Sequence, residues 1–578
     1  MRTLNPEIAS ATGGAGTMRS LLARQGVRDR IWIVLATLAC LVPFLAKPLN
    51  IDDPLYVWTA ERIHVHPTDY FGFRLNWYGS EQPFSYIINN PPGLGYTLAL
   101  VAALLGWDER SLHAGMLLPS VAASLGMYAL ARRLCPAPLL ATLIGIFTPL
   151  FLVSSTGLGC ETLMLAFWLW AIALWIRGVD DARPSWLVAS SLLVTAATLA
   201  KYYALGLLPL LAAYTLARGR RRWACAVWLG IPLLLLAAYE LVSREAYGEG
   251  LLHSATSYAL VARSALAPDL ATTVLTGLAF AGGTTASVFF FAPLLWSRSI
   301  LVGAFLATVV LASELALAGH VSQLVLRDAG ATRWSVLAQT SLMMMAGLQL
   351  VALAVRDLVT RRDAEALLLT LGVGGTLIFA MFLNWTVNSR SLLPLAPLGG
   401  VLVARALSAS SFVTSARRWI AFGALAPGAL LAFAVAWADY EFALATRNAV
   451  AQLTERHGHS EGHAWFLGHW GFQYYMERAG VRPVDLANGH LAAGDLLFAA
   501  ENNATPELPR QSIAVLEVLE LPIAGWISTM SVVAHAGLHS SVFGPIPFAI
   551  GTPPKEHFLV ARVTEPIRGV AGQLVSDP

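Results

Sequence analysis

Two adjacent carboxylates, Asp52 and Asp53, follow a long apolar stretch and open the segment IDDPLYVWTAERI. Two acids this close raise one another's pKa, and a carboxyl group with a raised pKa can act as a general base. Helix capping is the structural alternative, because Asp53 precedes Pro54, and proline is favoured as the first residue of a helix. Capping would not require Asp52, so the pair favours a chemical role.

Another acid and three basic residues stand in segments that could meet this pair. Glu161 opens the apolar segment after TGLGC, where it could compensate a helix dipole or face the same site as the pair. Lys201, in TLAKYYALGLLP, could extend to the membrane surface or bind a lipid phosphate. Arg390, in NWTVNSRSLLPLAPL, offers a bidentate phosphate contact, and Arg74, in FGFRLNWYG, is a third candidate.

Acids and cations of this kind suit group transfer from a lipid-phosphate donor. A hydroxyl group loses a proton as it attacks the anomeric carbon of a sugar, so the reaction needs one carboxylate base. A phosphate leaving group needs positive charge rather than a general acid, unlike the alcohol that leaves in glycoside hydrolysis. One base and a basic phosphate site would suffice, without a nucleotide fold or a metal.

The elements that position these residues are predicted to be membrane-spanning helices. Of 578 residues, 56% are hydrophobic and 13% are charged, whereas soluble proteins carry about 25% charged residues. Apolar runs of about 20 residues recur, long enough to cross a bilayer as helices. About thirteen spans are predicted, near 31–47, 111–131, 138–154, 161–177, 186–200, 202–218, 223–241, 271–296, 299–319, 334–355, 365–385, 391–407 and 418–438.

Arginines on alternate connections predict the orientation. Positive residues mark cytoplasmic loops, and here they are Arg28, Arg30, Arg132, Arg133, Arg177, the run from Arg218 to Arg222, Arg356, Arg361, Arg362, Arg417 and Arg418. The N-terminus is therefore predicted to be cytoplasmic. The chain is then predicted to cross the cell's inner (plasma) membrane many times. Asp52 and Asp53, which follow the first span, lie on its outer side. Because the number of spans is odd, the C-terminal part lies on the outer side too.

Three regions follow from this topology. Residues 1–30 are predicted to be a disordered cytoplasmic tail, and residues 31–439 an α-helical polytopic membrane domain. Its first extracytoplasmic loop, 48–110, is expected to hold interfacial helices and to be functional because of its length. Residues 440–578 are predicted to form a small extracytoplasmic α/β domain.

A histidine cluster in the C-terminal region raises the question of a metal site. His457, His459, His463 and His469 lie close in the sequence, with Glu461 between them. No tight zinc-ligand spacing is present, so a structural or solvated role is favoured over a metal. We expect no metal, no other cofactor and no nucleic-acid partner.

Five stretches resemble the C-type glycosyltransferase superfamily, in its branch of protein O-mannosyltransferases and lipid A aminoarabinose transferases. They are IDDPLYVWTAERI, NNPPGLGY, GLGCETLMLAFWLW, LAKYYALGLLPLL and NSRSLLPLAPL. By this resemblance Asp52 matches the catalytic acid, Asp53 matches its acidic neighbour, and Glu161 matches the second acid of the outer loops. Lys201 and Arg390 match basic positions on the donor-phosphate side.

The resemblance also implies the reaction. The donor would be a polyprenyl-phosphate-linked sugar, and the anomeric carbon would be inverted. Ser391 stands where an aromatic residue is common in the family, and Asn89 and Asn90 stand where a histidine is frequent. The sugar is therefore left open, as is the acceptor, which could be a lipid, a glycan or a protein.

Two other functional classes remain. A secondary transporter would place ionisable groups near the middle of the bilayer, and Glu314, in LASELALAGH, is the clear acid inside a predicted span. A non-catalytic scaffold that displays the C-terminal domain is the third reading, but it leaves the long first loop without a role.

Overall fold

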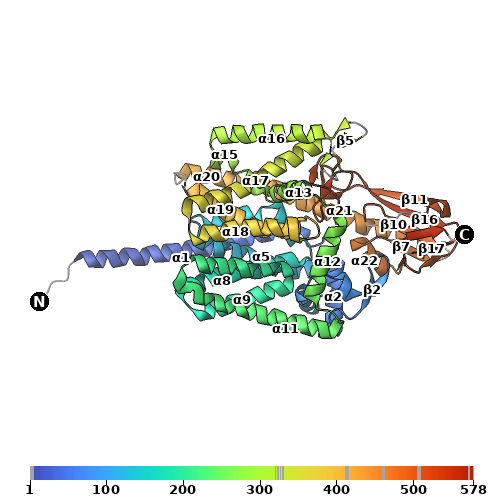
Figure 1. Ribbon diagram of the computed structural model, residues 1–578, viewed down its shortest axis with the longest axis horizontal. Helices are drawn as coiled ribbons and strands as arrows, with labels where there is room; N and C mark the ends of the chain where they lie inside the picture. The colour runs from blue at the N-terminus through green and yellow to red at the C-terminus, as the bar shows by residue number, and fades with distance from the viewer. Residues whose placement is uncertain are drawn as a thin grey trace.

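The computed structural model describes residues 6–318, 320–321, 324–325, 327–328, 331–409, 415–458, 463–503, 509–570 and 573–576. A body of helices occupies most of the molecule, and strands gather at one end of it (Figure 1). The first helix, α1 (Pro6–Leu41), projects from the opposite end. It begins 25 residues before the first predicted span, and the disordered tail expected over residues 1–30 stays a prediction.

Seven helical segments within the described residues are long and apolar enough to cross a membrane. They are α5 (Glu109–Leu134), α8 (Cys160–Asp181), η3 with α11 (Arg220–Tyr247), α16 (Arg298–Ala318), α17 (Trp334–Arg361), α18 with the π-helical η4 (Ala364–Leu383) and the segment Trp419–His457, which includes α21 (Leu425–His457). Two bent pairs would raise the number to nine. The helical character is as predicted, whereas the number thirteen and the full topology stay predictions.

Several predicted spans are broken or short. Helices α6 (Pro138–Ile146) and α7 (Pro149–Ser155) meet at 63° because Pro149 interrupts the helix, and α12 (Leu251–Leu266) and α13 (Leu270–Thr284) meet at 114°. Shorter apolar helices are α4 (Gly93–Leu105), α9 (Pro184–Ala200), α10 (Leu207–Ala217) and α19 (Leu395–Ala409). Helix α12 lies in a region where no helix was predicted.

The first loop folds against the helical body. It contains α2 (Asp53–Val65), a hairpin of β1 (Arg74–Asn76) and β2 (Glu81–Pro83), and α3 (Phe84–Ile87) before α4. Helices were expected in this loop, and α2 and α4 are two of the helices it contains. Helix α2 packs closely on α4. A Cβ atom added at Gly95 of α4 would lie only 2.4 Å from Cγ2 of Thr59 in α2, so the contact requires a glycine.

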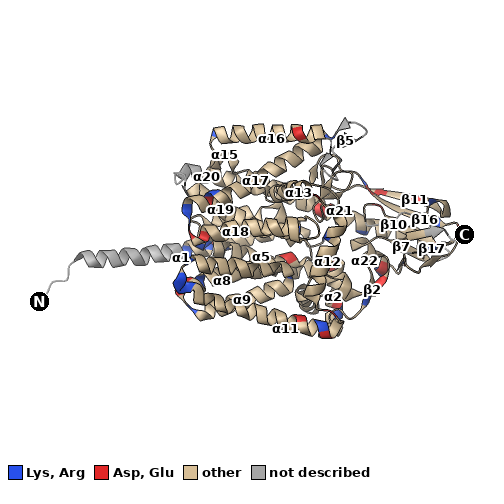
Figure 2. Cartoon of the chain, viewed as in Figure 1, with Lys and Arg blue, Asp and Glu red and all other residues tan. Residues whose placement is uncertain are grey.

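Basic residues gather at the end of the helical body that lies away from the strands (Figure 2). Arg218 forms ion pairs with Asp180 and Glu365, and Arg405 forms ion pairs with Asp357 and Asp363. Connections that are distant in sequence therefore meet at this end of the helical body, which we call the basic face (Figure 2). This agrees with the sequence pattern, in which arginines on alternate connections were predicted to lie on one side of the membrane. Which side of a membrane this face occupies stays a prediction.

The C-terminal region is an α/β unit around one sheet of order β11-β16-β10-β7-β8. Its strands are β7 (Ala464–Leu467), β8 (Arg482–Pro483), β10 (Leu496–Ala500), β11 (Ile513–Leu521) and β16 (Glu556–Val563). Helix α22 (Trp470–Arg478) packs on this sheet, and Phe472 stacks on Phe558. Helix α21 runs through the expected boundary at 439–440, so the last span and this domain share one helix.

Candidate active site

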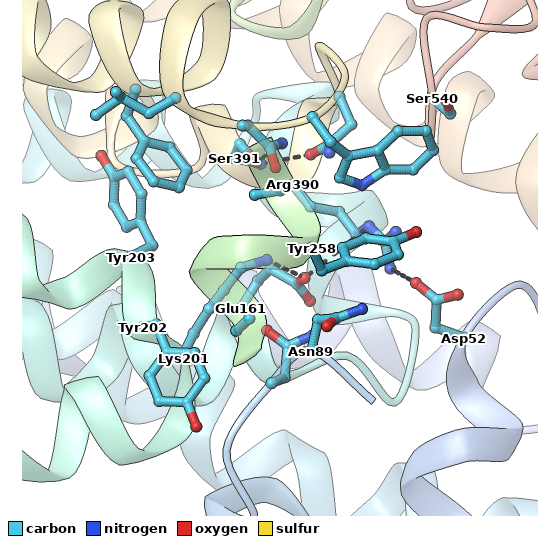
Figure 3. A pocket seen from close by; sticks show the side chains of 18 of the residues that line it. Asp52, Asn89, Glu161, Lys201, Tyr202, Tyr203, Tyr258, Arg390, Ser391 and Ser540 are labelled. Carbon is cyan, nitrogen blue, oxygen red and sulfur yellow. Dashed lines mark hydrogen bonds and ion pairs between the residues drawn. The ribbon is translucent and has the colours of Figure 1, made fainter. Parts of the chain in front are cut away.

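A cavity of about 1360 Å³ lies between the helical body and part of the C-terminal domain, and residues of both line it. Four charged residues line it, two acids and two cations, namely Asp52, Glu161, Lys201 and Arg390. Figure 3 shows that their side chains converge although they come from four different segments. Most of the charged candidates identified in the sequence thus meet in one place.

Asp52 reaches the cavity from a tight turn before α2. The preceding residue, Ile51, has φ 46°, a left-handed conformation that is costly for a β-branched residue. Asn50 supports the turn, since its Oδ1 accepts a hydrogen bond from the Ile51 amide. Arg390 Nη1 lies 2.8 Å from Asp52 Oδ2, so the carboxylate that we expected to act as a base is paired with a guanidinium.

Glu161 and Lys201 form the second pair. Glu161 stands in the first turn of α8, where the helix dipole favours an acid, and its side chain is buried. Lys201 follows the last residue of α9 in an extended conformation, which turns the side chain out of the helix. Lys201 Nζ lies 2.6 Å from Glu161 Oε1, and Arg390 Nε lies 3.9 Å from the same oxygen. Arg390 is therefore shared between the two acids.

Asp53 points away from the main cavity. Its carboxylate accepts hydrogen bonds from the Asn50 and Leu158 amides, both at 3.0 Å, and so ties the turn to the loop before α8. It does not cap the helix that follows, which was the structural alternative. Burial raises its pKa to about 6, although Lys47 and the two amides act in the opposite direction.

Arg74 does not reach the cavity. It lies in the β1–β2 hairpin, where its Nη2 donates to the Glu81 carbonyl at 2.7 Å and its side chain is exposed. The antiparallel register of the hairpin keeps Arg74 beside its own partner strand, opposite Pro83. The structure thus does not bring Arg74 together with Lys201 and Arg390, the other predicted phosphate-binding residues.

Several lining residues gave no chemical signal in the sequence. Tyr56 lines the cavity and places its hydroxyl 3.0 Å from Asn90 Nδ2 and 3.2 Å from Cys160 Sγ. Tyr78 and Tyr258 bring their hydroxyl oxygens within 3.5 Å of each other, from the first loop and from α12. Burial raises the pKa of Tyr78. Asn89 and Asn90 were noted only as departures from the family pattern.

The C-terminal domain contributes one wall of the cavity. His469, Trp470, His539 and Ser540 line it. His469 stacks on Trp77 with ring centroids 5.4 Å apart, and burial lowers its pKa to about 4. These residues lie close to Asp52 only because the C-terminal domain folds back onto the first loop, which no local sequence pattern reveals.

An apolar groove extends from the charged residues along α18. Leu371, Gly374, Gly375 and Ile378 line it, and this spacing places them on one face of the helix. A Cβ atom at Gly374, Gly375 or Gly206 would meet open space. These positions of the lining therefore carry no side-chain bulk, and Tyr202, Tyr203 and Lys201 line the same cavity.

The histidine cluster separates in the structure. His457 Nε2 lies 2.8 Å from Glu517 Oε2, His463 is exposed near Asp495, and His469 lies in the cavity wall. His459 and Glu461 fall outside the described residues. Within the described part of the chain, no three acids, histidines or cysteines are grouped as ligands of one metal ion.

Glu314 lies on an exposed face of α16 and not among the residues that line the cavity. An ion-coupled transporter would hold such an acid inside its helical bundle. Its position gives the transporter reading no support.

One family model matches the sequence. Residues 89–243 match the family described as dolichyl-phosphate-mannose-protein mannosyltransferase. The matched region holds Glu161, Lys201 and the stretch NNPPGLGY, and the match confirms the resemblance to this class of membrane glycosyltransferase. No curated protein matches the chain.

Three solved structures illustrate the structural likeness. The oligosaccharyltransferase of Archaeoglobus fulgidus in the apo form is 15% identical, with a TM-score of 0.49, over 80% of this chain and 65% of that one. ArnT from Cupriavidus metallidurans bound to undecaprenyl phosphate is 14% identical, with a TM-score of 0.41, over 83% of this chain and 93% of that one. The arabinofuranosyltransferase AftD from Mycobacteria is 15% identical, with a TM-score of 0.38, over 92% of this chain and 40% of that one. This chain thus spans less than two-thirds of the length of the oligosaccharyltransferase, and scores below 0.5 do not indicate a shared function.

Proposed function

We propose that this protein is an inverting glycosyltransferase that moves a sugar from a polyprenyl-phosphate donor to a hydroxyl acceptor at the outer face of the cytoplasmic membrane. The observation that carries this proposal is that one cavity contains two cations, two acids and an apolar groove lined in part by glycines. The family match supports the same class of reaction. The acceptor, a lipid, a glycan or a protein, would enter from the wall formed by the C-terminal domain.

Lys201 and Arg390 are suited to hold the donor phosphate. Both side chains line the cavity, and the groove beside Lys201 would take the isoprenoid chain. As the bond between the anomeric carbon and the phosphate oxygen breaks, its electron pair passes to that oxygen. The phosphate then gains negative charge, and two cations placed beforehand stabilise it more strongly than they stabilise the bound donor.

Asp52 is the proposed base. The acceptor oxygen attacks the anomeric carbon from the face opposite the phosphate, its proton passes to Asp52, and inversion results. In the structure Asp52 is paired with Arg390. A donor phosphate that attracts Arg390 would release the carboxylate, so that Asp52 becomes a free base when the donor is in place.

Glu161 fits a supporting role. It is buried, and it contacts both Lys201 and Arg390. A buried carboxylate that keeps two cations together reduces their repulsion before the phosphate arrives. Asp53 acts on the turn that carries Asp52, through its bonds to two amides. No cofactor enters this mechanism.

The test is sugar transfer in liposomes from a synthetic polyprenyl-phosphate sugar, with mass spectrometry of envelope glycolipids and glycans identifying the acceptor. Asp52→Asn should abolish transfer while the protein is still expressed. Glu81→Gln, an exposed acid of the same loop, is the matched control and should keep full activity. Near-normal transfer by Asp52→Asn would remove Asp52 as the base, and ion-coupled solute uptake without sugar transfer would favour a transporter.

A further inference from the structure

A second, small pocket lies behind the charged residues of the cavity. Its volume is about 30 Å³, and its lining includes Asn50, Asp53, Glu161, Arg390 and His539. This is room for about one water molecule. Several polar residues stand in the lining, and they join the turn before α2 to the C-terminal domain.

Three buried nitrogen atoms of this lining have no hydrogen-bond partner among the described residues. They are Asn50 Nδ2, Arg390 Nε and His539 Nδ1. Buried polar groups are nearly always hydrogen-bonded, so three such atoms around one pocket point to a shared partner. Asn50 Nδ2 and Arg390 Nε are both donors.

The surroundings of His539 determine what its free nitrogen can do. His539 Nε2 lies 2.8 Å from Asp439 Oδ1, and Asp439 Oδ2 lies 2.6 Å from Lys47 Nζ. Asp439 and Lys47 are buried together, and a carboxylate paired with an ammonium group accepts hydrogen bonds. Nε2 therefore carries the hydrogen, and in the tautomer with this single ring hydrogen Nδ1 is an acceptor.

The geometry points to a single buried water molecule in this pocket, which makes His539 a positioning residue for Arg390. A water molecule accepts two hydrogen bonds, here from Asn50 Nδ2 and Arg390 Nε, and donates one to His539 Nδ1. Its second hydrogen faces a lining that includes the carboxylates of Asp53 and Glu161. Two donors and one acceptor thus match the bonding capacity of water.

The backbone near His539 supports this link. Ser389 donates from its amide, at 3.0 Å, and from its hydroxyl, at 2.6 Å, to the Leu538 carbonyl. The Ser541 amide donates to the Val387 carbonyl at 2.8 Å. The segment just before Arg390 is therefore hydrogen-bonded to the segment that carries His539. By this route the C-terminal domain sets the orientation of the guanidinium, and, on the proposed function, of the donor-phosphate site.

Two substitutions separate the roles of the two ring nitrogens. In His539→Gln the amide group replaces Nε2, which keeps a donor for Asp439 but removes the acceptor at Nδ1. In His539→Asn the amide group replaces Nδ1, which keeps an acceptor for the water but removes the bond to Asp439. We expect His539→Gln to bind polyprenyl phosphate about tenfold more weakly than the wild type, and His539→Asn to lose less affinity than His539→Gln.

The measurement is the affinity of the full-length protein for polyprenyl phosphate, together with the KM for the donor and kcat. If His539 positions Arg390, His539→Gln raises the KM for the donor more than it lowers kcat. If the bond to Asp439 has a purely structural role, His539→Asn is the weaker binder of the two, and that result would overturn the inference. His557→Gln, an exposed histidine on strand β16, is the control and should not change affinity.

A high-resolution map of the wild type tests the water independently of activity and of whether the variants fold. Density for one water molecule within hydrogen-bond distance of all three nitrogen atoms is expected. A map in which His539 Nδ1 contacts a protein group instead would overturn the inference. Absence of sugar transfer by the wild type, with the water present, would overturn the proposed function and leave the water site standing.

Discussion

At the scale of single residues, position rather than charge separates the candidates for phosphate binding. Arg390 and Arg74 were both predicted to bind the donor phosphate. Arg390 lines the cavity, whereas Arg74 is exposed on a hairpin. The sequence predicted both, because residue type and local context do not report which side of a hairpin a side chain occupies.

The pair gives a matched experiment. Arg390→Gln removes a guanidinium that lies between two carboxylates, and we expect affinity for polyprenyl phosphate to fall about 10- to 100-fold, since hydrogen bonds to charged groups are strong. Arg74→Gln should leave affinity unchanged. Equal losses in the two variants would show that general surface charge, and not the cavity, attracts the phosphate.

Residues such as Asp52, Glu161 and Lys201 could be predicted because each follows or opens an apolar run in a distinctive stretch. His539 could not, because its partner Asp439 lies 100 residues away in the sequence. A contact of this kind depends on how the C-terminal domain packs on the helices. Local patterns carry no information about it.

At the scale of elements, the face of α18 with Gly374 and Gly375 is the feature that suits a lipid chain. A leucine at position 375 would fill open space in the groove without a clash in the protein. We expect Gly375→Leu to raise the KM for a long-chain donor, and to affect a donor with a short isoprenoid chain less.

Gly303→Leu is the control for this change. Gly303 is also an exposed helical glycine with open space around it, but it belongs to α16 and does not line the cavity. Its kinetics should match those of the wild type for both donors. A uniform effect of Gly375→Leu on long and short donors would argue against a groove for the chain.

Strand β16 carries a buried acid that should make the C-terminal domain sensitive to pH. Burial raises the pKa of Glu556 to about 7, while Asn502 donates to its carboxylate at 3.0 Å. Its ordinary value is about 4.3. The folded state therefore binds more protons than the unfolded state between these values, and stability falls as the pH rises from about 4.3 through 7.

Glu556→Gln removes this titration. We expect the variant to be more stable than the wild type at pH 8 by roughly 3–4 kcal/mol and to lose most of the difference at pH 5. Thermal unfolding at the two pH values, followed in the full chain, measures the effect. A gain that is the same at both values would show that the carboxyl group does not titrate in this range.

Helix α12 shows where prediction of elements failed. The spans were found from apolar length, but α12 is moderately polar and buries only Leu251, so its sequence resembles a loop as much as a helix. Strands β7, β10 and β11 lie in HAWFLGHW, GDLLFAAE and SIAVLEVLEL, and each of these stretches contains a compact apolar run that is typical of a strand.

At the scale of the whole molecule, the basic face and the C-terminal domain lie at opposite ends of the helical body (Figures 1 and 2). The positive-inside rule then predicts that the cavity and the C-terminal domain lie outside the cytoplasm. The number of spans was harder to predict than this polarity, because bent pairs and short helices are not distinguished from full spans by hydropathy.

Cysteine labelling in intact spheroplasts tests the orientation. In a background without the four native cysteines, His490→Cys on the C-terminal domain should react with a membrane-impermeant reagent, and Arg221→Cys on the basic face should react only after lysis. Both positions are exposed. The reverse pattern would place Asp52 in the cytoplasm and contradict the proposed reaction at the outer face.

The most direct test of the central claim is the structure of the protein with bound polyprenyl phosphate. The account predicts phosphate oxygens within about 3 Å of Lys201 Nζ and of the Arg390 guanidinium, with the isoprenoid chain along Gly374 and Gly375 and with Asp52 released from Arg390. A phosphate bound elsewhere, with the ion pair between Asp52 and Arg390 intact, would contradict it.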